Sequence, residues 1–378
     1  MRSSCGGVDD AEHAGARSAA GARRGNYGGR VSEVAVLTLA ELTTLRLGGP
    51  VGRLVCTGTA PELVAAVRTA DAAGEPVLLV GGGSNLVVAD EGWPGVTVLI
   101  RTDGIDVRRD GDEVLLRVAA GADWDGLVAR AVTAGWAGIE CLSGIPGRTG
   151  ATPVQNVGAY GQDVAQTLTD VTVWDRDADM VAVLSTVDCA FGYRTSRLKH
   201  TDRYVVLDVG LRLPISVLSR PIAYAELARA LGVQPGAQVP LAEVRDAVLE
   251  LRRGKGMVLD PDDNDTWSAG SFFTNPILDE AELAAFERRL EPGTAYPSWP
   301  AESGTKLSAG WLIEQSGFTK GYGDGPVRLS TKHTLALTNR GAARTADLLT
   351  LARQVRDGTR TRFGVELRPE PKFVNCTL

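Results

Sequence analysis

Three side chains lie in short segments whose residue types suit a reaction on an anionic substrate. Arg194 lies in FGYRTS (191–196), Ser271 in AGSFFTNP (269–276) and Glu370 in RPEPKF (368–373). Arginine offers a fixed, permanently charged fork that matches a carboxylate. Glu370 lies between two prolines that stiffen its backbone. A lone serine such as Ser271 is a poor general acid in water.

Each of these three residues also has a structural interpretation. Arg194 could form an ordinary salt bridge in a loop, Glu370 could be a surface glutamate, and AGSFF could be a plain turn into a strand. The types of residue alone leave these alternatives open.

A long glycine-rich stretch occupies residues 144–163 and shows neither helical nor strand periodicity. A segment of this length without regular structure usually binds something. Its glycines let the backbone approach a ligand closely, and Gln155, Asn156 and Tyr160 offer polar groups. We interpret the stretch as a wall against a flat, polar ligand, with a long surface loop as the alternative.

A second glycine cluster, GGGSNL at 81–86, follows the apolar run 76–80. Successive backbone N–H groups in such a loop can form a nest for a phosphate. The cluster lacks the Gly-Lys-Ser/Thr of a P-loop and the GxGxxG spacing of a Rossmann turn. A tight structural turn is therefore an equally good interpretation of this cluster alone.

Charge and composition exclude several classes of protein. A net charge of −6 argues against a general nucleic-acid binder, and no apolar run approaches the length of a membrane span. The five cysteines lack metal-ligand spacing, which predicts free thiols in a reducing compartment, and three scattered histidines make a zinc or iron cluster improbable. All six lysines lie in the second half of the chain, which indicates where an anion could dock.

Around these segments the periodicity predicts a mixed α and β chain. Residues 1–34, rich in Gly, Ala, Ser and Arg, are predicted to be disordered, and 254–266 to form a mobile loop. Helices are expected at about 59–73, with a capping box at its start, and at 124–134, 224–231, 241–253, 280–290, 306–313 and 342–356. Strands are expected at about 52–56, 76–80, 96–100, 114–118, 171–174, 180–184, 204–213 and 335–337, with a hairpin joining 171–174 to 180–184.

Six stretches together resemble the UDP-N-acetylenolpyruvoylglucosamine reductases of cell-wall synthesis, the MurB family. The resemblance covers about residues 37–374, and Tyr224 in PIAYAEL matches the longer of the family's two types. The matching stretches are VLLVGGGSNL (77–86), GIPGRTGATPVQNVGAYG (144–161), FGYRTS (191–196), AGSFFTNP (269–276), KLSAGWLI (306–313) and RPEPKF (368–373).

The resemblance implies an α+β fold: the two-subdomain FAD-binding fold of vanillyl-alcohol oxidase and p-cresol methylhydroxylase (PCMH/VAO type), with a C-terminal α/β substrate-binding domain. It places FAD-binding subdomain 1 at 35–100 with a return at 364–378, subdomain 2 at 101–255 and the substrate-binding domain at 256–363. It also implies noncovalent FAD, NADPH as reductant and UDP-N-acetylglucosamine enolpyruvate as substrate. We further expect a cytoplasmic monomer without nucleic-acid or membrane partners.

The resemblance also implies roles for individual residues. Hydride would pass from FAD N5 to C3 of the enolpyruvyl group, and the carbanion at C2 would take a proton. Arg194, Ser271 and Glu370 would act in this step, and Tyr160, Arg194, Tyr224, Lys255, Asn275 and Lys306 would bind the substrate. The FAD-binding residues would be Arg46, Gly81, Gly82, Gly83, Ser84, Asn85, Leu86, Gly144, Ile145, Pro146, Gly150, Ala151, Gln155, Asn156, Gly158 and Ala159. Thr274 departs from a lysine found in some relatives, which puts one phosphate contact in doubt, and we expect the other four lysines to be solvated.

Two other functions remain as alternatives. A flavin oxidase of the same fold would use O₂ and an alcohol, but it gives no reason for the Ser271 and Glu370 motifs. A flavin- or nucleotide-sugar-binding sensor would keep 81–86 and 144–161 but would not need Arg194, Ser271 and Glu370 together.

Overall fold

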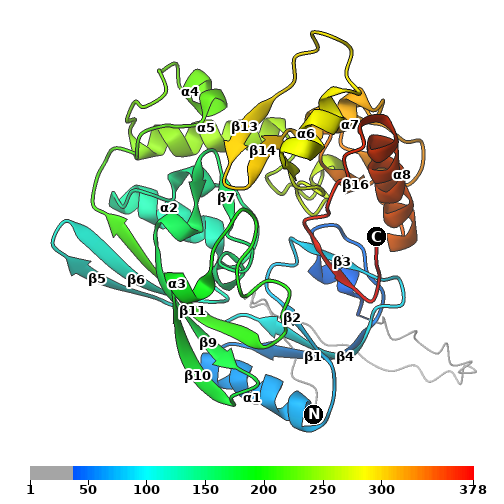
Figure 1. Ribbon diagram of the computed structural model, residues 1–378. Helices are drawn as coiled ribbons and strands as arrows, with labels where there is room; N and C mark the ends of the chain where they lie inside the picture. Colours follow the sequence, from blue (N-terminus) through cyan, green and yellow to red (C-terminus); the bar gives the residue numbers. More distant parts are fainter. Residues whose placement is uncertain (1–36) are drawn as a thin grey trace, which may run out of the picture.

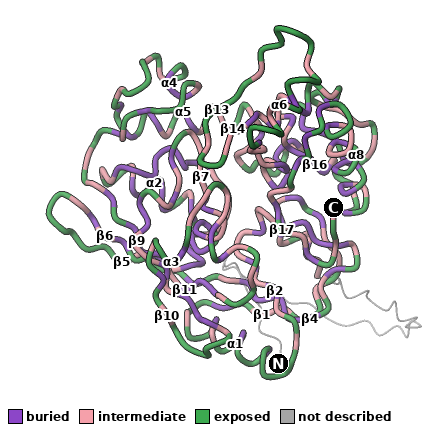
Figure 2. Tube along the Cα trace, viewed as in Figure 1, coloured by how far each residue is buried: buried purple, intermediate pink, exposed green. Residues whose placement is uncertain are grey.

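The computed structural model describes residues 37–378 and divides them into three packed units (Figure 1). The predicted disordered tail, 1–34, lies outside the described residues. Buried residues run through the interior of all three units (Figure 2).

The first unit is a small parallel sheet with one helix. The sheet has the strand order β1-β4-β2, and α1 covers it with Leu63, Val67 and Ala70. The capping box predicted at Thr59 is present, since Thr59 accepts a hydrogen bond from the Glu62 N–H and the Glu62 side chain accepts one in return. The elements are β1 (Val51–Thr57), α1 (Ala60–Ala72), β2 (Val77–Val80), β3 (Leu86–Val88) and β4 (Trp93–Ile100).

The second unit is a five-stranded antiparallel sheet in the order β10-β9-β11-β6-β5. Helix α2 (Trp124–Ala134) packs on its inner face and has the predicted bounds. The predicted hairpin is confirmed by the antiparallel pairing of β9 with β10. The strands are β5 (Ile105–Asp110), β6 (Glu113–Ala119), β9 (Leu168–Asp175), β10 (Met180–Ser185) and β11 (Tyr204–Pro214).

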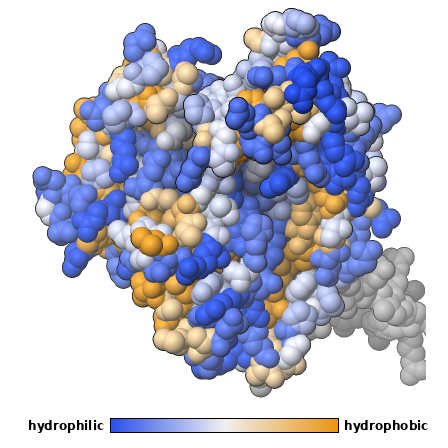
Figure 3. Space-filling model, in the orientation of Figure 1, coloured by the Kyte–Doolittle hydropathy of each residue, from blue (hydrophilic) through white to orange (hydrophobic). Residues whose placement is uncertain are grey.

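Short elements and two further helices complete this unit. The stretch 144–163 is irregular for most of its length, as expected. It also contains a short hairpin whose strands, β7 and β8, have two residues each. The elements are β7 (Gly158–Ala159), β8 (Gln162–Asp163), α3 (Thr186–Cys189), α4 (Ala225–Ala230) and α5 (Leu241–Gly254). Met180, Val181 and Val183 of β10 and Val187 of α3 are exposed. Figure 3 shows apolar surface at the lower left of the view.

The third unit packs small strand pairs against α6, α7 and α8. Its core also takes in Leu45, Leu47 and Val87, so it is continuous with the first unit. The elements are β12 (Ile277–Leu278), α6 (Glu280–Glu287), β13 (Ser298–Ala301), β14 (Gly304–Leu307), α7 (Ala309–Gln315), β15 (Val327–Leu329), β16 (Leu337–Asn339) and α8 (Thr345–Phe363).

The helix predicted at 280–290 ends at Glu287, and two other predicted helices in this unit also have different bounds. The helix predicted at 306–313 begins only at Ala309, because 304–307 pair as β14 and Ser308 caps the helix by accepting from the Trp311 N–H. The helix predicted at 342–356 runs from Thr345 to Phe363 and ends at Gly364, which has a φ of 73°. Both errors arise from tertiary pairing and capping that apolar spacing does not record.

The end of the chain returns to the first unit, where β17 (Lys372–Val374) pairs in parallel with β3. Nearby, Phe273 forms a bridge with Pro369, and the Glu370 N–H donates to the Phe272 carbonyl at 2.9 Å. This return brings the segments around Ser271 and Glu370 side by side.

Asp90 connects the first unit to α8. Its carboxylate accepts from the N–H groups of Thr345 and Ala346 at 2.8 and 3.1 Å. We expect Asp90→Ala to lower the free energy of unfolding by about 1–2 kcal/mol, because two helix N–H groups lose their acceptor. Urea denaturation measures this change. Asp103→Ala, at an exposed position, is the control, and equal loss in both variants would contradict the capping role.

Candidate functional site

The glycine loop 81–86 presents backbone donors that the protein leaves unused. Within residues 37–378, the N–H groups of Gly82, Gly83, Ser84 and Asn85 make no hydrogen bond to the protein. Four successive free donors at the end of a buried strand suit the oxygens of a pyrophosphate. The loop therefore fits the phosphate portion of FAD.

The two glycine-rich segments lie against each other. A Cβ added at Gly82 would lie 2.7 Å from the Gly147 Cα, so only glycine permits this approach. Ser84 Oγ donates to the Pro146 carbonyl at 3.0 Å, and Asn85 Nδ2 donates to Gln155 Oε1 at 2.8 Å. The predicted phosphate loop and the predicted wall thus form one continuous surface.

The other predicted cofactor residues hold the wall in place. The Gly144 N–H donates to Asp125 at 2.6 Å, and Gly150 packs so tightly that an added Cβ would lie 2.5 Å from the Ala120 Cβ. Asn156, at a φ of 47°, donates to the Gly192 carbonyl and accepts from the Ala165 N–H. Ile145 and Ala159 pack against the core of the second unit, and Gly158 lies in β7. Ala151 is the exposed last residue of a 3₁₀ turn whose other residues are buried.

Arg46 lies farther along the same interface, against the third unit. Its guanidinium stacks on the Trp267 ring at 3.6 Å, and its Nη2 donates to the Pro261 carbonyl at 3.3 Å. The segment 260–267 is also held by Asp265, which accepts from Thr331 and pairs with Arg340. This segment, which we predicted to be a mobile loop, is thus tied to its neighbours by several contacts.

Gly83 offers a direct test of the phosphate loop. Its φ is 62°, and an added Cβ would lie 1.8 Å from the Leu42 carbonyl oxygen. We expect Gly83→Ala to lose most of its bound FAD and to have a lower Tm, measured from the flavin-to-protein absorbance ratio and by thermal scanning.

Gly111→Ala is the matched control, because Gly111 has a φ of 63° but open space around it. This control should cost only the backbone strain of about 1–2 kcal/mol. Equal FAD content in the two variants would contradict the proposed role of the loop.

The predicted catalytic residues Arg194 and Glu370 form a pair. Arg194 Nε lies 3.4 Å from Glu370 Oε1, and its Nη2 donates to the Gly158 carbonyl at 2.7 Å. Burial raises the pKa of Glu370, and the charges of Arg194 and Lys199 oppose that rise. A raised pKa favours the protonated, neutral form of the carboxyl group, and this form can lie beside a second carboxylate without charge repulsion.

Ser271 lies in the segment that pairs with the backbone of Glu370. It is half-buried and precedes Phe272, whose carbonyl accepts the Glu370 N–H. Asn85 Nδ2 lies 3.5 Å from the Glu370 carbonyl oxygen, so the phosphate loop also reaches this point. The fold therefore brings the three predicted catalytic segments to the edge of the glycine-rich surface.

Tyr193 connects this centre to two predicted substrate residues. Lys306 Nζ lies 4.9 Å from the centroid of the Tyr193 ring. Burial raises the pKa of Tyr193, and hydrogen bonds with Asn275 oppose that rise. Asn275 Oδ1 also accepts from the Ala309 N–H at 2.9 Å, so it helps to begin α7. Sequence reasoning overlooked Tyr193, although it lies in the FGYR motif.

The other predicted substrate residues form a second group. The rings of Tyr160 and Tyr224 meet edge to face at 5.6 Å, and Lys255 Nζ lies 5.5 Å from the centroid of the Tyr160 ring. Lys255 also pairs with Glu226 at 2.6 Å. Burial raises the pKa of Tyr160 to about 12, so its hydroxyl stays protonated and can donate.

A cavity of about 430 Å³ opens beside Lys255 and is lined by cations that we expected to be solvated. Its lining includes Lys320, Lys332 and His333 from the third unit, and Glu226 and Glu250 from the second. Lys332 pairs with Asp263 at 2.6 Å. Three of the chain's six lysines converge here, and their rarity was the one sequence signal that could have identified them.

His333 gives this cavity a pH signature. Burial, together with Lys255 and Lys320, lowers the pKa of His333 to about 4. In the unfolded chain His333 has its higher, ordinary pKa, so the unfolded chain binds a proton as the pH falls below about 6.5, whereas the folded protein does not. Stability is therefore lost as the pH falls from about 6.5 to 4.

We expect the wild type to lose up to about 3 kcal/mol of unfolding free energy relative to His333→Gln between pH 7 and 4, measured by urea denaturation at each pH. His200→Gln, at an exposed position, is the control. A constant difference between wild type and His333→Gln would refute this expectation.

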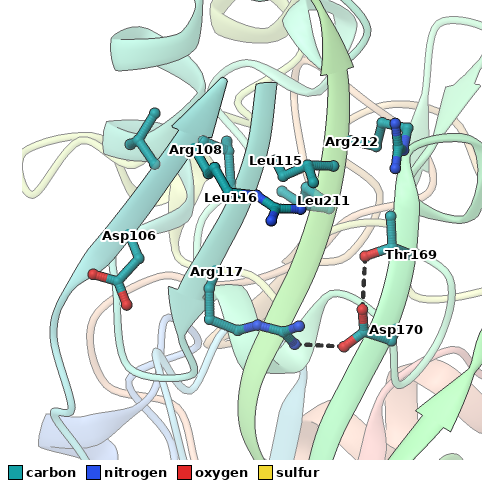
Figure 4. Close-up of a pocket in the computed structure, with 10 residues that line it drawn as sticks. Asp106, Arg108, Leu115, Leu116, Arg117, Thr169, Asp170, Leu211 and Arg212 are labelled. Atoms are coloured by element: carbon teal, nitrogen blue, oxygen red, sulfur yellow. Dashed lines mark hydrogen bonds and ion pairs between the residues drawn. The ribbon is translucent and has the colours of Figure 1, made fainter. Parts of the chain in front are cut away.

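Another cavity, of about 420 Å³, lies on the outer face of the five-stranded sheet (Figure 4). Its central Arg117 pairs with Asp170 and Asp208, and Thr169 donates to Asp170. These charges satisfy one another, and none of the predicted site residues lies here. In the part of the chain that is described, no cluster of three His, Cys, Asp or Glu residues could hold a metal ion, and no helix is long and apolar enough to cross a membrane.

Comparison with known proteins gives matches over most of the chain. The family model "UDP-N-acetylenolpyruvoylglucosamine reductase, C-terminal domain" matches residues 260–374, and that of the FAD binding domain matches residues 52–183. The chain is 58% identical to the UDP-N-acetylenolpyruvoylglucosamine reductase of Thermobifida fusca (strain YX), over 90% of this chain and 97% of the relative. It is 57% identical to that of Streptomyces avermitilis, over 92% and 96%.

A solved structure is also similar. The crystal structure of UDP-N-acetylenolpyruvylglucosamine reductase (MurB) from Thermus caldophilus covers 89% of this chain and 97% of its own, with 27% identity and a TM-score of 0.62. Together with the match to the FAD binding domain, this likeness confirms the predicted α+β FAD-binding fold.

Proposed function

Because the chain belongs to the UDP-N-acetylenolpyruvoylglucosamine reductase family, we propose roles for its residues in that family's reaction. The protein is an FAD-containing oxidoreductase that uses NADPH to reduce UDP-N-acetylglucosamine enolpyruvate to UDP-N-acetylmuramate in peptidoglycan synthesis. Bound FAD supplies the hydride transfer from NADPH to the enolpyruvyl double bond.

The pairing of Arg194 with Glu370 at the edge of the glycine-rich surface carries the proposal. Arg194 binds the carboxylate of the enolpyruvyl group and stabilises the negative charge that builds there during reduction. The Gly158 carbonyl and Glu370 hold the guanidinium in place before the substrate arrives. A group fixed in advance costs little reorganisation when the charge develops.

Ser271 holds the proton that is delivered to C2. A serine hydroxyl is a weak acid, so it needs a neighbour that restores its proton. Glu370 lies in the adjacent segment, and burial raises its pKa, so a protonated carboxyl group is available close by. This arrangement supports a short relay between the two groups.

The uridine diphosphate lies toward the cavity beside Lys255. Lys320 joins Lys255 there and supplies a second cation for a diphosphate, while Tyr160 and Tyr224 offer ring faces and hydroxyls. Glu226 now holds Lys255 and would have to release it. The negative charge of the substrate is the physical reason for that exchange.

The two alternative functions account for less of this arrangement. A sensor has no use for a half-buried Glu370 paired with Arg194. An alcohol oxidase has no use for a carboxylate-binding arginine. We also propose a monomer in the cytoplasm. Analytical ultracentrifugation tests the monomer.

An anaerobic absorbance titration tests the function. The flavin band should bleach when NADPH is added and return when UDP-N-acetylglucosamine enolpyruvate is added. Bleaching without return would point to another acceptor, and the absence of a flavin band after reconstitution with FAD would contradict the flavin site.

Ser271→Ala should separate the two half-reactions. NADPH should still reduce the flavin at the wild-type rate, but reoxidation by the enolpyruvyl substrate should slow by about 10²-fold or more, as expected for loss of a positioned proton donor. Stopped-flow absorbance measures both rates. Ser298→Ala, at an exposed position in β13, is the control, and wild-type reoxidation in Ser271→Ala would remove the proposed role.

A further inference from the structure

Lys199 is half-buried beside the catalytic pair, although sequence reasoning assigned it to solvent. It follows Leu198, which is buried in the core of the second unit, so the chain cannot swing the lysine outward freely. By contrast, Lys372 is exposed and pairs with exposed Asp202 on the surface. The position of Lys199 therefore needs a specific explanation.

The Lys199 ammonium supports the backbone of Arg194. Gly192 and Thr195 exchange two backbone hydrogen bonds around a tight turn, and Arg194 within it has a φ of 54°, which is unfavourable for a residue with a side chain. Lys199 Nζ donates to the Arg194 carbonyl at 2.9 Å. This bond fixes the peptide that follows Arg194 and so stabilises its left-handed conformation.

Arg194 is thus held at both ends. Its carbonyl accepts from Lys199, while its guanidinium donates to the Gly158 carbonyl and faces Glu370 at 3.4 Å. If the backbone relaxed from the left-handed conformation, the Cα–Cβ direction would change and the guanidinium would leave both partners. A small displacement of a group that orients a substrate can cost a large factor in rate.

The charge of Lys199 acts at the same place. Burial lowers the pKa of Lys199, and the negative charge of Glu370 opposes that effect. The lysine in turn lowers the pKa of Glu370 against the effect of burial. A cation is thus kept here, partly out of water, beside the carboxyl group of Glu370.

We propose that Lys199 is a positioning residue that holds Arg194 in its left-handed conformation, so that the guanidinium meets the substrate carboxylate. The inference rests on the proposed role of Arg194. It predicts that the loss of Lys199 affects the enolpyruvyl half-reaction and leaves the reduction of the flavin by NADPH unchanged.

The experiment compares Lys199→Met with Lys199→Arg, which keeps a charged donor, and with Lys372→Met as a matched surface control. In the holoenzyme, Lys199→Met should keep wild-type FAD content and flavin reduction, while reoxidation by the enolpyruvyl substrate slows roughly tenfold to a hundredfold. Lys199→Arg should recover much of that loss, and Lys372→Met should match the wild type. Stopped-flow absorbance gives each rate, and Tm and FAD content report folding.

A double-mutant cycle with Arg194→Ala separates this inference from the proposed function. Lys199→Met should add little to Arg194→Ala, because the lysine acts through the arginine. If Arg194→Ala slows reoxidation but Lys199→Met does not, only the present inference fails; if Arg194→Ala has no effect, both fail. The inference would also be overturned if Lys199→Met slowed both half-reactions equally, if its effect added fully to that of Arg194→Ala, or if Lys199→Arg recovered none of the lost rate. If Lys199→Met does not fold, Lys199→Gln takes its place. The rates of flavin reduction and reoxidation in Lys199→Gln and Lys199→Arg are then compared by the same criteria.

Discussion

The structure depends on placing the carboxyl group of Glu370 out of water beside the guanidinium of Arg194. An unpaired buried carboxylate is costly, so the group must be protonated or matched by nearby cations. Arg194 and Lys199 supply two, and burial keeps the pKa of Glu370 raised despite them. In the reaction that we propose, this balance matters because a carboxylate substrate would enter a site that already contains an acid.

Meeting that constraint requires distant segments to converge. Glu370 reaches the site because β17 pairs with β3 directly after the phosphate loop, and because the segment 368–370 runs alongside Phe272 and Phe273. Arg194 lies in a tight turn where its own backbone is left-handed, and its guanidinium donates a hydrogen bond to the Gly158 carbonyl of the glycine-rich wall. The buried aromatic pair Phe272 and Phe273, whose ring centroids lie 5.1 Å apart, anchors the segment that carries Ser271.

The distribution of charge solves a second problem. The chain has a net charge of −6, yet the proposed substrate carries a diphosphate and a carboxylate. The fold gathers Lys255, Lys320 and Lys332 around one cavity and places Lys306 over Tyr193. Two of these cations have a carboxylate partner in the described structure: Glu226 for Lys255 and Asp263 for Lys332. Such a partner keeps the lysine oriented, but the carboxylate must release the lysine when an anionic ligand binds.

The sequence by itself determined the family and the fold class, and its motifs predicted the segments of the proposed site. Contiguous motifs such as GGGSNL and RPEPKF carry that information in order, and the capping box at Thr59 and helix α2 follow from local spacing. Tertiary structure decided which side chains share a partner. Lys199 follows the FGYRTS motif and Lys372 lies within RPEPKF, but Lys199 supports the Arg194 backbone and Lys372 pairs with Asp202 on the surface. The beginning of α7 and the fixing of 260–267 likewise depend on strand pairing and on Asp265, whose partners lie 66 and 75 residues away in the chain. Local sequence cannot show such contacts, because their free energy comes from groups that only folding brings together.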